Sequence, residues 1–136
     1  MKEIGTQDVG WEDSYLLGWK RSMEDLLLFV QVLLSDSHSG FKPFDEDTEH
    51  GSYRLGVLSF SSGVQCAGLP DHDWVPRWDN ELAEFVDVAE IDSFDVDESG
   101  CRIDADELEL QIRSAFVKLE LLEEESEAVF STEFRS

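Results

Sequence analysis

Two segments near the N-terminus carry apolar side chains at almost every position. Residues 15–20 read "YLLGWK" and residues 26–34 read "LLLFVQVLL". A strand that is buried on both faces has such a continuous apolar run, and the polar "KRSMED" between the two segments is typical of a hairpin connection. The pattern therefore predicts two neighbouring central strands. One helix over residues 23–34 is the alternative, because Leu26, Leu27, Val30, Leu33 and Leu34 also fit a helical spacing.

Two segments in the C-terminal half alternate strictly between apolar and polar residues. They read "ELELQIR" over 107–113 and "FVKLELL" over 116–122. A period of two predicts strands with one buried and one solvated face. We therefore expect a hairpin that turns near Ser114 and Ala115. Its solvated face should carry Glu107, Glu109 and Glu120.

The middle of the chain predicts shorter elements. Residues 53–60, "YRLGVLSF", alternate like a strand, and "GVQCAGL" after the turn residues "SSG" predicts the second strand of another hairpin. Two prolines exclude a regular central strand from residues 70–80, "PDHDWVPRWDN", so Trp74 and Trp78 should lie in an ordered loop folded onto the core. Residues 81–92 fit a short helix or a weakly alternating strand, and the pattern leaves both open.

These elements predict a mostly β protein with at most one or two short helices. We expect a single antiparallel sheet domain of six to eight strands over residues 1–122, arranged as a sandwich or an open barrel. Residues 35–52 collect Ser, Gly, Pro and acids, which is typical of a loop. The acidic segment 123–136 follows neither period, and we expect it to fray.

The composition supports a folded chain without a membrane segment. Hydrophobic residues make up 41% of the 136 residues and aromatic residues 11%, which a disordered acidic chain would lack. The N-terminus has no apolar signal region, and every apolar run is too short to span a bilayer. Cys66 and Cys101 match no metal-binding spacing, so we expect free thiols, with one disulfide as the alternative. A soluble cytoplasmic protein is the resulting expectation.

Net charge is the most extreme property of the sequence. The chain has 32 acids and 10 Lys or Arg, for a net charge of −22, and residues 71–127 alone hold 20 acids against 4 bases. Such a surface repels nucleic-acid phosphates and steers a basic protein partner inward. An acidity that reflects only solubility or a high-salt habitat is the alternative.

Residues 94–107, "FDVDESGCRIDADE", resemble the calcium loop of the EF-hand family. The first positions agree, but the eighth, which should be aliphatic, is Arg102, and the twelfth, which should be Glu, is Asp106. The downstream residues also have a strand period, whereas the family requires a helix. We therefore favour a turn at "DESG" between two strands, with the glycine supplying a positive φ. The matching residues are Asp95, Asp97, Ser99 and Gly100.

The remaining candidate chemistry is sparse. His72 lies between Asp71 and Asp73, and with His38 and His50 it could form a metal site only if two loops meet. The sequence contains no nucleophile elbow and no phosphate-binding loop, so we expect no enzymatic activity, no catalytic residues, no cofactor and no resident metal. The four tryptophans could line an aromatic cleft, but core packing is the simpler expectation. They are Trp11, Trp19, Trp74 and Trp78.

The segment from residue 11 to residue 36 resembles small bacterial β-domain proteins. The resemblance is carried by "DSYLLGW", where Asp-Ser leads into a first strand, and by the apolar "LLLFVQVLL", with a looser echo over 101–122. Many members of this group are uncharacterised, and some are described as immunity proteins of polymorphic toxin systems. The resemblance implies a compact β fold and a protein-inhibitor role, without catalysis and without identifiable binding residues.

The sequence thus predicts a non-enzymatic, acidic protein-binding domain. Its partner would be a basic protein such as a nuclease toxin, whose phosphate-binding surface the carboxylates would cover. The alternative is a small-molecule or metal-binding β domain that uses the loops at 35–52 and 71–80.

Overall fold

A computed structural model describes residues 1–35, 52–122 and 129–130. Eleven strands form in these residues, and no helix does. The strands are β1 (Lys2–Ile4), β2 (Val9–Ser22), β3 (Asp25–Leu34), β4 (Ser52–Ser61), β5 (Gln65–Ala67), β6 (Arg77–Asp79), β7 (Glu84–Val86), β8 (Ala89–Asp97), β9 (Gly100–Ala105), β10 (Leu108–Arg113) and β11 (Phe116–Leu121). The mostly β prediction is therefore confirmed.

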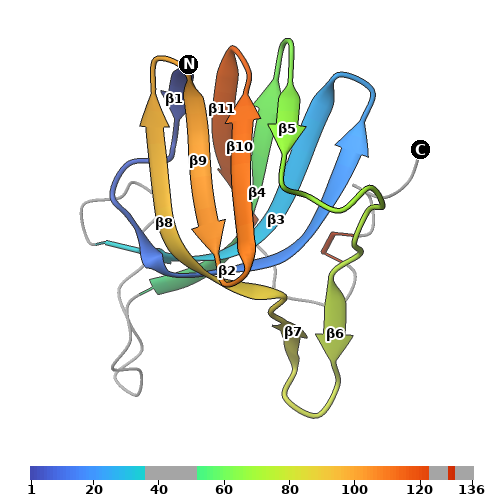
Figure 1. The fold of residues 1–136 in the computed structure, drawn as a ribbon. Coiled ribbons are helices and arrows are strands. Elements are labelled where there is room, and N and C mark those ends of the chain that lie inside the picture. Colours follow the sequence, from blue (N-terminus) through green and yellow to red (C-terminus); the bar gives the residue numbers. More distant parts are fainter. Residues whose placement is uncertain (36–51, 123–128, 131–136) are drawn as a thin grey trace.

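Nine strands form one mixed sheet that does not close into a barrel. Their order is β1-β11-β4-β3-β2-β8-β9-β10-β5, and β6 pairs with β7 in a separate two-stranded sheet. Every pairing is antiparallel except the parallel pair β1 and β11, so the sheet is mostly antiparallel, with one parallel pair at its edge. The sheet bends at a short contact between β2 and β8, and its two halves face each other (Figure 1).

The main core lies between the two halves of the sheet. From one half, β3, β4 and β11 direct Leu28, Leu58 and Leu119 inward. From the other half, β9 and β10 direct Ile103 and Leu110 toward them. Burial of these apolar faces is the dominant favourable contribution to folding. The strict alternation of β9, β10 and β11 follows directly, because their opposite faces are exposed.

A second apolar cluster covers the outer face of β2, β3 and β4. Leu17, Phe29, Leu55 and Val57 point away from the main core and are buried beneath the β6–β7 hairpin and Phe130. This second layer explains why the sequence of β3 is apolar on both faces. It also confirms the prediction that residues 26–34 form a buried central strand rather than a helix.

Two of the predicted hairpins were wrong: the one that joins residues 53–60 to "GVQCAGL" and the one that turns near Ser114 and Ala115. The strand β10 pairs with β9 and β5, while β11 pairs with β4 and β1, so residues 114–115 cross from one half of the sheet to the other. Likewise β5 pairs with β10 and not with β4. A period of two shows which side chains face the core, but strands on opposite sides of one core share that pattern without being neighbours.

Residues 81–92 contain no helix. They include β7 and the start of β8, and the turn between β6 and β7 is closed by Asp79 Oδ1, which accepts hydrogen bonds from the amides of Glu81 (2.9 Å) and Leu82 (3.2 Å). The predicted loop at 35–52 and most of the predicted tail at 123–136 lie outside the described residues. Phe130 belongs to that tail segment and is nevertheless buried. Among the described residues there is no helix with the length and apolarity needed to cross a membrane.

Candidate functional site

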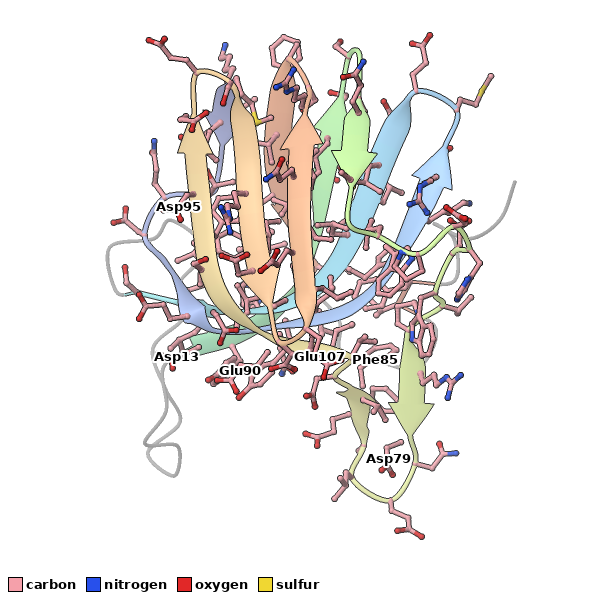
Figure 2. All side chains as sticks on the ribbon, in the orientation of Figure 1. Asp13, Asp79, Phe85, Glu90, Asp95 and Glu107 are labelled. Carbon is pink, nitrogen blue, oxygen red and sulfur yellow. The ribbon has the colours of Figure 1, made fainter. Side chains whose placement is uncertain are left out.

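The outward surface of β8, β9 and β10 concentrates negative charge. We call it the acidic face and define it by its carboxylates, which alternate with inward apolar residues along these strands: Glu90, Asp92, Asp95, Asp97, Asp104 and Glu109. Only two basic residues, Arg102 and Arg113, belong to the same three strands. In Figure 2, Asp95 lies along β8, and Glu90 and Glu107 lie near the lower ends of the strands.

Register places two carboxylates directly opposite each other within the acidic face. Asp104 on β9 is paired with Glu109 on β10, and like charges in directly opposed positions destabilise a sheet. Partial relief comes from Arg102, whose Nε lies 3.5 Å from Asp104 Oδ2, and from Ser93, whose hydroxyl donates to the same oxygen at 3.0 Å. Asp104 Oδ1 is shielded from solvent, and no donor reaches it within the described part of the chain.

Two tyrosines border the acidic face at its lower end. The Tyr15 and Tyr53 rings lie 6.3 Å apart, Tyr15 is paired with Glu90 across β2 and β8, and the Tyr53 hydroxyl donates to the main-chain oxygen of Asp13 at 3.2 Å. Burial raises the pKa of Tyr53, and Tyr15 and the carboxylates of Asp13 and Glu90 raise it further. Tyrosine is enriched in protein–protein interfaces, because its ring is apolar and its hydroxyl can form a hydrogen bond.

The EF-hand resemblance at 94–107 corresponds to a β-hairpin, as favoured from the sequence. Asp97 is paired with Gly100, and Asp97 Oδ1 accepts hydrogen bonds from the Ser99 amide (2.7 Å), the Ser99 hydroxyl (2.6 Å) and the Gly100 amide (3.1 Å). The hydrogen bonds from Ser99 hold the pKa of Asp97 below its ordinary value. Gly100 has a φ of +149°, as predicted for the turn glycine.

Of the three histidines, only His72 belongs to the described residues, so their convergence stays a prediction. The main-chain oxygen of His72 accepts a hydrogen bond from the Trp19 indole at 2.9 Å. The centroid of the His72 ring lies 6.4 Å from that of the Trp74 ring. His38 and His50 lie outside the described residues. Where the structure describes the chain, no group of three His, Cys, Asp or Glu side chains is arranged to hold a metal ion.

The four tryptophans do not share one cleft. Trp11 stacks on Phe94, Trp19 lies beside Trp74, and Trp78 packs edge-on against Phe85. The distances between the ring centroids of these pairs are 4.2, 5.8 and 5.0 Å. Trp74 lies in the 70–80 loop and is joined to Trp19 by two main-chain hydrogen bonds, so this loop is folded onto the core as predicted. Trp78 instead belongs to β6.

Beside Trp19 an open cavity of about 670 Å³ lies at the end of the main core. Its apolar lining is Trp19, Val88, Ala89, Ala105 and Leu108, and Asp106 and Glu107 complete it. Ala89 and Ala105 are both buried and have the smallest side chains of this lining, so the space beside the indole is left unfilled.

The two cysteines are free thiols, as predicted, and their positions in the sheet forbid a disulfide between them. Cys66 and Cys101 are both paired with Ile112, on opposite sides of β10. Two strand spacings separate their Cα atoms by about 10 Å, whereas a disulfide requires less than about 7 Å.

Cys101 should make stability depend on pH in the alkaline range. Burial raises the pKa of its thiol from 9.0 to about 12, so the unfolded chain loses this proton first as pH rises. The folded state is therefore stabilised below pH 9, and this contribution is lost between about pH 9 and 12. Urea titrations across this range should show a smaller loss of unfolding free energy for Cys101→Ala than for the wild type. An equal loss of unfolding free energy in the two proteins between pH 9 and 12 would contradict a raised pKa for Cys101.

Sequence reasoning missed the role of Ser14. This serine is fully buried. Its hydroxyl donates a hydrogen bond to the Gly10 main-chain oxygen (2.8 Å), and Ser14 Oγ accepts one from the Leu33 amide (3.1 Å). These bonds fix a register shift in β2 between Gly10 and Tyr15. A polar residue just before an otherwise apolar run was the available signal, since a buried hydroxyl requires partners.

The chain matches no protein family model, no curated protein and no solved structure. The resemblance to immunity proteins therefore stays a prediction.

Proposed function

We propose that the protein is a non-enzymatic binding domain whose acidic face engages a basic protein, in the manner of an immunity-like inhibitor. The supporting observation is the directly opposed pair Asp104 and Glu109 within a surface of six carboxylates and two arginines. Cationic side chains of a partner would relieve this repulsion. Binding would thus be coupled to the removal of an unfavourable interaction in the free domain.

The tyrosine pair gives the same surface an apolar component. Carboxylates chiefly raise the association rate and select against acidic partners, whereas buried tyrosines supply much of the affinity in protein interfaces. Tyr15 is next to Glu90 in the sheet, so both contributions occur side by side. A surface of this kind suits a folded basic protein, and its charge disfavours nucleic acid.

The test is capture of partners from the native host by the wild type and by two charge-matched variants. The face variant carries Asp95→Asn, Asp104→Asn and Glu109→Gln. The control variant carries Glu24→Gln, Glu81→Gln and Glu120→Gln, which neutralise three exposed acids elsewhere. We expect a basic protein to be retained by the wild type and the control, lost by the face variant, and released by 0.5 M salt because screening at that ionic strength is strong.

If both variants lost the partner equally, binding would depend on the total charge of the protein and not on the acidic face. That outcome would support the alternative that the acidity serves solubility. An acidic partner, or retention that salt does not alter, would contradict the proposed function.

The cavity beside Trp19 favours a second candidate function, binding of a small molecule. Its volume of about 670 Å³ lies within the usual range for ligand sites. The apolar lining and the two carboxylates favour an apolar ligand with a cationic group. The Ala105→Leu variant should fill the space and abolish binding.

This candidate is tested by tryptophan fluorescence. Titration with phenethylamine should perturb the emission of the wild type but not that of Ala105→Leu, and phenylacetate, which has the opposite charge, should have no effect. Identical responses of the two proteins, or no response to the amine, would exclude this site.

A further inference from the structure

A small cavity opens where β2 and β8 separate. The two strands are paired only at Tyr15 with Glu90 and at Leu16 with Ala89. Beyond this contact the first half of β2 leaves β8, and a cavity of about 300 Å³ lies between residues 9–13 and residues 93–95. Ligand sites are seldom smaller, so the space suits one long side chain rather than a segment of secondary structure.

The cavity has an aromatic floor that is held in place. The rings of Trp11 and Phe94 are stacked at 4.2 Å with 17° between their planes. The Trp11 indole donates to the Thr6 main-chain oxygen at 3.1 Å, and Trp11 is buried, whereas Phe94 is only half-buried. Phe94 therefore offers ring surface to a group that enters the cavity.

Carboxylates surround the opening because β2 is irregular at this point. The register shift fixed by Ser14 leaves the consecutive residues Glu12 and Asp13 both exposed, although alternation in a regular strand would turn one of them inward. Asp95 lies across the cavity on β8. In the described ranges no salt bridge involves these three acids, and the nearby Arg102 instead has its Nε 3.5 Å from Asp104.

We propose that this cavity receives one arginine side chain of the basic partner, with its methylene groups against Phe94 and its guanidinium toward the carboxylates of Glu12, Asp13 and Asp95 at the opening. The cavity and its aromatic floor define the site, and the surrounding charge selects its occupant. A guanidinium pairs with carboxylates through several donors in a planar fork, which a lysine ammonium cannot do equally.

The proposal rests on the proposed function and adds to it the chemistry of the anchoring residue. Residues 36–51 of the same chain are a poor alternative occupant, since they contain five acids and Lys42 as the only Lys or Arg. A second copy is disfavoured in the same way by the net charge of −22.

The test is an NMR titration of ¹⁵N-labelled protein with the peptide Ac-Gly-Arg-Gly-NH₂. We expect saturable shifts of the Trp11 indole resonance and of the Phe94 and Asp95 amides, and none with the citrulline peptide, a neutral analogue of the same shape. Asp95→Asn should weaken binding of the arginine peptide about tenfold, because the negative charge that strengthens its hydrogen bond to the guanidinium is removed. The matched variant Glu81→Gln loses the same charge in the β6–β7 turn and should bind like the wild type.

Equal weakening by Asp95→Asn and Glu81→Gln, or equal shifts with the citrulline peptide, would overturn the arginine site. A wild-type protein that does not bind the arginine peptide would also overturn the arginine site. If the capture experiment still retained a basic partner, the proposed function would stand without this site. Specific peptide binding without any basic partner in the capture experiment would instead support the cavity and contradict the proposed function.

Discussion

Replacing Phe130 with alanine should lower the free energy of unfolding by about 3 to 5 kcal/mol. The Phe130 ring is only 2% exposed and lies 5.0 Å from Phe29 and 5.1 Å from Phe85. Its removal would leave a cavity between the β6–β7 hairpin and the outer face of β3. Urea denaturation, followed by tryptophan fluorescence, measures the change.

The matched control is Phe116→Ala, which removes the same side chain from a position that is 40% exposed. Its cost should be well below that of Phe130→Ala, because less apolar surface returns to water. If the two variants were equally stable, the packing of Phe130 onto the second cluster would be wrong.

Replacing Gly68 with alanine should cost about 2 to 5 kcal/mol, the sum of backbone strain and overpacking. Gly68 has a φ of +101°, and a Cβ there would lie 1.9 Å from the main-chain oxygen of Glu109. Because that oxygen belongs to β10, the added methyl group would push the chain after β5 away from its only partner strand. Thermal and urea unfolding would both report the loss.

Gly63→Ala separates the two contributions. Gly63 also has a positive φ, of +70°, but a Cβ there would meet nothing within 4 Å. This variant should show only the strain of about 1 to 2 kcal/mol. A Gly68→Ala protein as stable as Gly63→Ala would mean that Gly68 does not approach β10 as described.

The sequence was most informative where burial alone decides the pattern. The apolar run of β3 and the alternation of β10 and β11 predicted strands, because each side chain there reports which face it occupies. Pairing was not accessible in this way. The links at Ser62–Gly63 and at Ser114–Ala115 both resemble hairpin turns, yet each carries the chain across the core to a different half of the sheet.

Only part of the candidate site could be predicted. Glu109 of the acidic face is exposed, as expected from the period of two, and so are Glu107 and Glu120, which lie outside that face. The opposition of Asp104 to Glu109 depends on register, and the separation of β2 from β8 depends on a bulge fixed by Ser14. Neither feature has a signature in one sequence, since both arise from contacts between distant segments.

The sheet ends in β1 on one side and β5 on the other, each three residues long. Open strand edges invite copies of a protein to join into filaments, and short edges are one way in which natural β proteins limit this hazard. An incoming chain would find a ladder of three residues at either end. Short strands at the two ends of the sheet thus leave little backbone there for another copy to pair with.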